Sequence, residues 1–148
     1  MALASPSDMT AELAAAVEAA RLEHDITRAR LHRLATAAFE NGERACRTLD
    51  RLLSAGGVER ALAAMQGDFQ QRHFGFQRRP FLGFFASRDP DVRRALNELP
   101  GAIREAAAAE ARLRDALAVQ RQRAMATGRS DDAETARTHM RTVRRSRA

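Results

Sequence analysis

The sequence predicts an all-α protein: an elongated antiparallel four-helix bundle with a phenylalanine-rich irregular hook, or cap, at one end. Three observations support this fold class. Ala, Arg, Glu and Leu dominate the 148 residues while β-branched residues are few, which favours helices over sheets. Two long segments keep apolar residues at helical spacing with neither Gly nor Pro inside them. Six of the seven phenylalanines are gathered between those two segments.

The first long helix is expected to begin at Ser5-Pro6-Ser7-Asp8 and to reach about Phe39. Ser5 is a suitable N-cap, Pro6 fits the first helical position, and Asp8 places an acid in the first turn. One helical stripe carries apolar residues: Leu13, Val17, Ala20, Leu31, Leu34 and Ala38. Leu22, Ile26 and Ala29 lie on the opposite side. We therefore expect the middle of this helix to be contacted on two faces.

Two short helices are predicted next. Asn41-Gly42 is a turn signal, and residues 43–54 return to a helical period. The inward positions of that segment are Ala45, Leu49, Leu52 and Leu53. Gly56-Gly57 breaks the chain again before a helix over residues 58–65, with Leu62 and Met65 inward. Helices this short are not stable alone, so they must pack on the long ones.

Residues 69–88 are expected to be irregular and to form the hook. Arginines alternate with phenylalanines there, and glycine and proline interrupt any regular helix. We expect this segment to be an apolar cap with solvated arginines; stacking of its rings on nucleic-acid bases stays open as an alternative. The structural residues of the predicted hook are Phe74, Gly75, Pro80, Gly83, Phe84 and Phe85.

The C-terminal third is expected to hold three helices. Asp89-Pro90-Asp91 is a helix start, and Pro100-Gly101 is expected to end that helix after Leu99. A long helix then spans about 102–127, until Gly128, and a last one starts at about Ser130 and frays in an arginine-rich end. The stripe of the long helix consists of Ile103, Ala106, Leu113, Leu117 and Ala124, with Glu110 inside it.

The net charge of +6 is concentrated at the C-terminus. All 25 basic residues are arginine, and residues 135–148 hold five of them and no acid. These five are Arg137, Arg141, Arg144, Arg145 and Arg147. Without them, residues 1–134 carry 20 basic and 19 acidic residues. We expect a nearly neutral bundle domain at 1–134, with its hook at about 68–100, and a basic tail at 135–148 that binds phosphates or an acidic protein surface. An ordinary solvated terminus stays open.

The histidines show no spacing typical of a metal site or a catalytic site. They are His24, His32, His73 and His139. His24 and His32 lie about 80° apart on an ideal helix, and no Glu-x-x-His motif occurs. His24 lies on the apolar stripe, so we expect a core histidine bonded to Glu110 or Thr27.

Glycine patterns for phosphate or dinucleotide binding are absent. We expect no catalytic residues, no metal and no cofactor, and hence no enzyme.

The single cysteine excludes a disulfide framework within the chain. Cys46 has Arg44 and Arg47 as neighbours, and nearby cations lower a thiol pKa. No partner for a reactive thiol is evident, so we favour a small buried apolar role.

No apolar run approaches the ~18 residues that cross a bilayer. We therefore expect neither a membrane span nor a leader.

Residues 39–99 resemble the Bep intracellular delivery (BID) domain of type IV secretion substrates. The resemblance rests on the order of short motifs: Phe39-Glu40-Asn41-Gly42, Gly56-Gly57-Val58, His73-Phe74-Gly75, Leu82-Gly83-Phe84-Phe85-Ala86 and Arg93-Arg94. In element order it covers about 130 of the 148 residues. The insertion of residues 76–82 between Gly75 and Gly83 departs from the family pattern.

This resemblance implies a non-catalytic translocation signal at the C-terminal end of an effector or a conjugative relaxase. Its partner would be the coupling ATPase of a type IV secretion system, and the parent protein would start in the bacterial cytoplasm before transfer into a recipient or host cell. Two alternatives stay open. One is a basic nucleic-acid-binding or inhibitor module of a plasmid or phage, and the other is a scaffold that dimerises through Leu22, Ile26 and Ala29. The sequence leaves the oligomeric state open.

Overall fold

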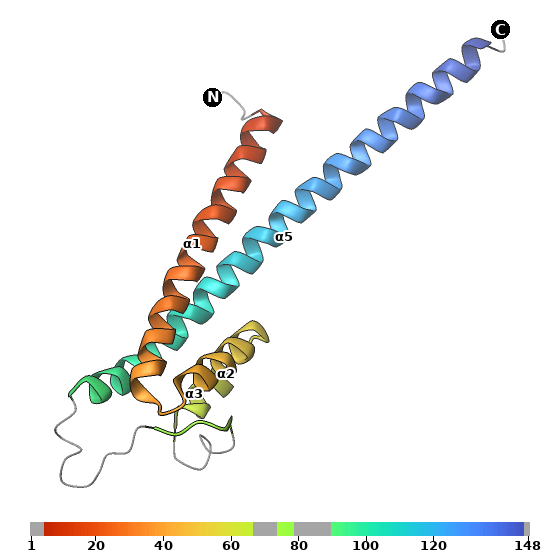
Figure 1. The fold of residues 1–148 in the computed structure, drawn as a ribbon. Helices are drawn as coiled ribbons and strands as arrows, with labels where there is room; N and C mark the ends of the chain where they lie inside the picture. Colours follow the sequence, from red (N-terminus) through yellow and green to blue (C-terminus); the bar gives the residue numbers. More distant parts are fainter. Residues whose placement is uncertain (1–4, 67–73, 79–89, 147–148) are drawn as a thin grey trace. The chain divides into compact units, whose positions relative to one another are not determined.

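The structure is a computed structural model that describes residues 5–66, 74–78 and 90–146. The elements over these residues are all helices, which confirms the predicted all-α class. They are α1 (Pro6–Ala38), α2 (Gly42–Ser54), α3 (Val58–Ala64) and α5 (Pro90–Ser146) (Figure 1). Apart from helices, the described residues contain one isolated antiparallel bridge between Phe39 and Arg78.

Helix α1 begins as the sequence predicts, with a reciprocal cap at its N-terminus. The backbone N–H of Asp8 donates to Ser5 Oγ at 3.2 Å, and the N–H of Ser5 donates to Asp8 Oδ2 at 3.3 Å. Two backbone donors that the first turn leaves unpaired are satisfied in this way. The helix continues for 33 residues because neither glycine nor proline follows Pro6 within it.

The turn between α1 and α2 depends on Asn41 and Gly42. Asn41 caps α2, since its side-chain oxygen accepts the N–H of Arg44 at 3.3 Å. Gly42 packs closely against the last turns of α1, where an added Cβ would lie 2.8 Å from the Cα of Thr36. Only glycine fits this approach. Gly56, with φ of 76°, then turns the chain from α2 into α3.

Helix α5 corrects three sequence predictions. It is one helix of 57 residues, so Pro100-Gly101 does not end a helix, Gly128 does not end a second one, and no new helix starts at Ser130. A proline inside a helix costs about 3 kcal/mol. The residues around this one, Leu99, Ala102 and Ile103, are buried, and their packing holds the helix together across Pro100.

Gly128 does not end the helix either, and its backbone conformation shows this directly. A helix-ending glycine normally takes a left-handed conformation with positive φ, and Gly128 does not adopt one. It lies in open space within α5, where it costs roughly 1 kcal/mol relative to alanine. The arginine-rich end, expected to fray, is helical as far as Ser146.

The chain divides into two compact units, each built from parts of α1 and α5. Residues 19–113 form one unit, which also contains α2 and α3. Residues 1–18 and 114–148 form the other. In this second unit the Met9 sulfur lies 3.7 Å from Arg123 Nη2, and a groove of about 650 Å³ runs past Leu13 and Ala124.

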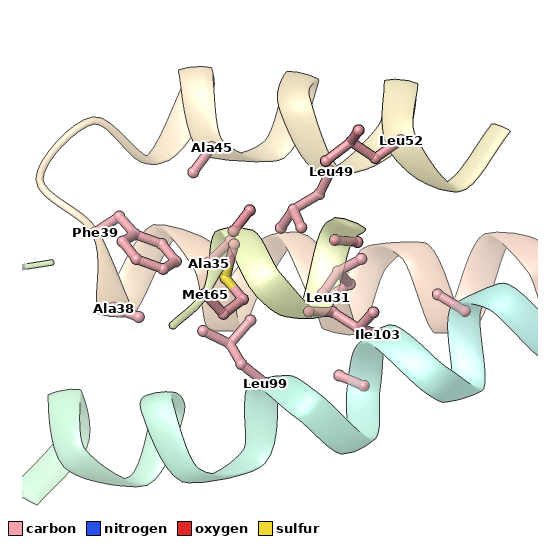
Figure 2. Packing of buried hydrophobic residues seen from close by; sticks show 14 of the residues in the cluster. Leu31, Ala35, Ala38, Phe39, Ala45, Leu49, Leu52, Met65, Leu99 and Ile103 are labelled. Atoms are coloured by element: carbon pink, nitrogen blue, oxygen red, sulfur yellow. The ribbon is translucent and has the colours of Figure 1, made fainter. Parts of the chain in front are cut away.

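The core of the 19–113 unit is a contiguous apolar cluster that draws on all four helices (Figure 2). Its largest fully buried side chains come from α1, α2, α5 and the segments around Phe39 and Phe76: Leu31, Phe39, Leu49, Leu53, Phe76, Leu99 and Ile103. Helix α3 adds the smaller Ala61 and Ala64. The ring of Phe76 meets that of Phe39 edge to face, with centroids 4.8 Å apart. Phe76 therefore belongs to this core, and Phe74 packs against it.

Within this unit, α1 and α5 run antiparallel. Glu23 pairs with Arg112, whereas Arg30, farther along α1, pairs with Glu105, nearer the start of α5. The predicted stripes supply the contact, because Leu31 and Ala38 of α1 and Ile103 and Ala106 of α5 are fully buried.

The prediction that the middle of α1 is contacted on two faces is wrong for the described chain. Leu22 and Ile26 are 63% and 60% exposed, and Ala29 is exposed as well. Leu31 and Ala35, on the other face, are fully buried. The described residues thus leave one apolar face of α1 uncovered.

Candidate functional site

The predicted partner-binding arginines lie on the last turns of α5. Arg137, Arg141, Arg144 and Arg145 are all exposed, and Arg147 lies outside the described residues. Helical spacing gathers Arg137, Arg141 and Arg144 along one side of α5. They border a shallow hollow of about 320 Å³ together with Ala136 and Met140. The structure thus brings three predicted cations together beside an apolar side chain.

The end of α5 has no buried side chain. Every residue from Ala124 to Ser146 is exposed, including Met140 at 70% and Val143 at 42%. Hydroxyl groups along this stretch donate to carbonyls of the preceding turn, as Thr138 does to Glu134 at 3.0 Å and Thr142 to Thr138 at 3.0 Å. Those hydroxyls are already engaged within the helix. From residue 137 onward the surface offers mainly guanidinium groups and the apolar side chains of Met140 and Val143, whereas Asp131, Asp132 and Glu134 expose carboxylates on the preceding turns.

A second polar cluster lies inside the 19–113 unit and joins three helices. Arg28 of α1 is 9% exposed and lies between two carboxylates. Its Nη1 donates to Asp50 Oδ1 of α2 at 2.5 Å, and its Nη2 donates to Glu110 Oε2 of α5 at 3.2 Å. Each carboxylate also contacts a histidine of α1: Nε2 of His24 lies 2.7 Å from Glu110 Oε2, and Nε2 of His32 lies 2.8 Å from Asp50 Oδ1.

This cluster, here called the Arg28 network, confirms the predicted contact between His24 and Glu110. Thr27, the other predicted partner, instead donates to the carbonyl oxygens of Glu23 and His24 within α1. Arg28 and Asp50 were not among the residues predicted from the sequence. A usable signal existed, because Arg28 follows His24 by one turn on the apolar stripe, where an unpaired charge is costly. The chemistry of the network is ion pairing between helices.

Two further histidines occur in the chain. His139 is exposed near the end of α5, and His73 lies outside the described residues. Among residues 5–66, 74–78 and 90–146, no group of three or more His, Cys, Asp or Glu side chains is arranged to hold a metal ion. No helix in those ranges combines the length and apolar character needed to span a membrane.

Of the predicted hook residues, Phe74 and Gly75 are described and Pro80, Gly83, Phe84 and Phe85 lie outside the described residues. Gly75 has φ of 78°, and an added Cβ would meet the Arg44 guanidinium at 2.5 Å. Phe74 is half-buried, and its ring centroid lies 6.4 Å from that of the buried Phe76. These two rings therefore favour packing over base stacking.

Cys46 is half-buried against the core, as its predicted apolar role requires. Burial is the main cause that raises the pKa of its thiol above the ordinary value; Asp50 adds to this and a hydrogen bond to Thr36 opposes it. Arg44 and Arg47, the sequence neighbours of Cys46, thus do not lower the pKa of its thiol below the ordinary value. With a raised pKa the thiol stays protonated at neutral pH, and the thiolate is the reactive form.

We expect alkylation of Cys46 by iodoacetamide at pH 7.5 to be about tenfold or more slower in the folded protein than in urea. Burial and the raised pKa both act in this direction. Mass spectrometry over a time course measures the two rates. Equal rates in the folded and unfolded protein would contradict the position of Cys46 against the core.

Comparisons of this chain with protein-family models, with curated proteins and with solved structures found no match.

Proposed function

We propose that this chain is a non-catalytic secretion-signal domain, which directs its parent protein from the bacterial cytoplasm into a type IV secretion system. The coupling ATPase at the channel entrance is the proposed partner, and the tail arginines of α5 are the proposed contact. The finer architecture of a four-helix antiparallel bundle with a phenylalanine-rich hook is part of this proposal. The observation that supports it best is the full exposure of residues 124–146.

An exposed single helix has little to stabilise it within the chain. Residues 124–146 include Gly128 and several Ser and Thr residues, which are weaker helix formers than Ala or Leu. A helix without tertiary packing is marginal in water. Binding a partner would supply the packing that the rest of the described chain does not give.

The chemistry of the exposed surface favours a protein over a nucleic acid. Arg137, Arg141 and Arg144 would attract phosphates and carboxylates alike. Met140 and Val143 beside them gain nothing from a phosphate backbone, but they match a partner surface with an apolar floor and an acidic rim. We therefore place the protein partner first and nucleic acid second.

Replacing Arg141, Arg144, Arg145 and Arg147 by glutamate is expected to reduce transfer about tenfold or more, since acidic groups would then face an acidic partner. The assay uses a reporter enzyme fused before residues 1–148 in donor bacteria that carry a type IV secretion system. Circular dichroism should show nearly unchanged helicity, because the described members of this set are exposed and any loss is confined to the last turns of α5, where acidic groups oppose the helix dipole. Full transfer by this variant would remove the proposed role of the tail.

A matched control separates a local effect from the change in net charge. Arg21, Arg51, Arg60 and Arg104 are also exposed but lie in the 19–113 unit, and their replacement by glutamate changes the net charge equally. This variant should transfer normally.

Nucleic-acid binding is tested with a single-stranded oligonucleotide. A mobility shift at ~50 mM salt that disappears at ~200 mM, together with normal transfer of the tail variant, would favour the alternative function.

A further inference from the structure

We propose that a second copy of this chain binds the uncovered face of α1, and that the two α1 helices form a short parallel coiled coil. The face, here called the α1 stripe, consists of Ala19, Leu22, Ile26 and Ala29. This inference does not depend on the proposed function, since the tail arginines take no part in it.

Exposure sets the α1 stripe apart from the rest of its unit. Leu22 and Ile26 are 63% and 60% exposed, the highest values among the large apolar side chains described in the 19–113 unit. On the other face of α1, Leu31 and Ala35 are completely buried in the core. A helix that is apolar on two faces buries both when it is fully partnered. The described chain buries one.

The spacing of the α1 stripe is that of a coiled-coil seam. Its members are separated by three, four and three residues, which is a heptad pattern. Ala19 and Ile26 take the a positions, and Leu22 and Ala29 take the d positions. A β-branched residue at a with leucine at d favours two parallel strands.

The charges that flank the α1 stripe support the same direction. In a parallel pair, Asp25 at a g position lies near Arg30 at the e position of the second copy, and this contact occurs twice by symmetry. An antiparallel pair centred between Leu22 and Ile26 would instead bring the two Asp25 side chains together. Within the chain Asp25 contacts His24 Nδ1 at 3.2 Å, and Arg30 Nη1 pairs with Glu105 Oε2 at 2.6 Å. Their side chains are still 78% and 41% exposed, so the second carboxylate oxygen of Asp25 and the remaining guanidinium N–H groups of Arg30 can reach the second copy.

Charges near the ends limit the strength of this pairing. Arg33 takes the a position after Ala29 and ends the apolar seam, because two arginines there repel each other. Glu18 lies near Glu23 of the second copy, and these two like charges repel each other. Arg112 pairs with Glu23 within the chain and so weakens this repulsion. The seam is therefore short and buries less area than a standard stable interface. We expect a dissociation constant on the order of 100 μM.

Sedimentation equilibrium of the full chain between about 10 and 500 μM tests the second copy as the occupant. Wild-type protein should show a monomer–dimer equilibrium over this range. Leu22→Asn with Ile26→Asn should remain monomeric and equally helical, because both positions are exposed. Val119→Asn with Met125→Asn, at exposed apolar positions of α5, is the matched control and should dimerise like wild type. A monomer throughout for wild type, or a dimer that persists in the α1 variant, would overturn the proposal.

Disulfide cross-linking tests the direction of the pair. Ala19→Cys and Ala29→Cys are made separately, each in a Cys46→Ser background. In a parallel pair each variant faces its own counterpart, so each alone should form a cross-linked dimer under mild oxidation. Arg21→Cys, which is exposed but off the stripe, should cross-link far more slowly. Cross-linking only when the Ala19→Cys and Ala29→Cys proteins are mixed would show an antiparallel pair and contradict the parallel one.

Discussion

Replacing Phe39 by alanine is expected to lower the free energy of unfolding by about 3–5 kcal/mol. Phe39 is fully buried directly after α1, where the chain turns toward α2. Its ring meets Phe76 edge to face, with centroids 4.8 Å apart and an angle of 69° between the planes. The substitution removes both the buried ring and this contact, and it leaves a cavity where α1, α2 and residues 74–78 meet.

Urea unfolding followed by circular dichroism measures this loss. A domain of this size has a total stability of roughly 5–15 kcal/mol, so the midpoint should fall steeply. Met125→Ala is the exposed control, since Met125 is 59% exposed, and it should change the stability by less than about 0.5 kcal/mol. A cost below about 1 kcal/mol for Phe39→Ala would show that its ring is not packed as described.

The partner ring gives a second measurement of the same contact. Phe76→Ala should also be strongly destabilising, because Phe76 is 1% exposed. The two substitutions should not add, and the double variant should reveal a coupling of about 0.5–1.5 kcal/mol. Additive losses would mean that the two rings stabilise the fold independently. Coupling would tie residues 74–78 to the core of the 19–113 unit.

Local signals in the sequence were sufficient to predict several helix boundaries. Ser5 is the N-cap of α1 as predicted, and Asn41, predicted as part of a turn, caps α2; these contacts are local because they involve residues at most three apart. The stripes of the long helices were predictable for the same reason, as a helical period fixes which side chains share a face. Prediction failed at Pro100 and Gly128. Both residues weaken a helix locally, but whether the helix ends there depends on packing and backbone conformation that neighbouring residues in the sequence do not determine.

The candidate sites were predictable to different degrees. The tail arginines needed only a charge count, whereas the Arg28 network needed the register of three helices. His24 and Glu110 were matched because both lie on apolar stripes, where polar groups need partners. Asp50 gave no such signal, because it is not one of the predicted inward positions of its helix, although the structure shows it half-buried beside them. The exposed α1 stripe appeared in the sequence as a second apolar face, but only the structure shows that the described chain leaves it uncovered.

Replacing Arg28 by methionine is expected to lower the free energy of unfolding by about 2–4 kcal/mol. Methionine keeps much of the length and apolar area of the side chain but removes the cation between Asp50 and Glu110. The two carboxylates would then lose their shared guanidinium within the unit. The expected cost lies below that of a fully buried pair because the Asp50 side chain is 37% exposed and water can screen it.

Urea unfolding at constant pH and salt measures this loss against a matched surface pair. Arg47→Met breaks the contact between Arg47 and Glu43, whose side chains are 71% and 83% exposed, and it should cost less than about 0.5 kcal/mol. If Arg28→Met costs no more than Arg47→Met, the network adds nothing to stability beyond a surface ion pair.

A triple variant separates the loss of attraction from the cost of unpaired charge. Arg28→Met combined with Asp50→Asn and Glu110→Gln removes the cation together with both carboxylate charges. It should recover at least about half of the stability lost in Arg28→Met, because replacing all members of a buried ion cluster is far less costly than removing one. No recovery would mean that the loss in Arg28→Met does not come from leaving two carboxylates without their shared cation. Recovery would identify electrostatic balance between α1, α2 and α5 as the physical reason for an arginine at this position.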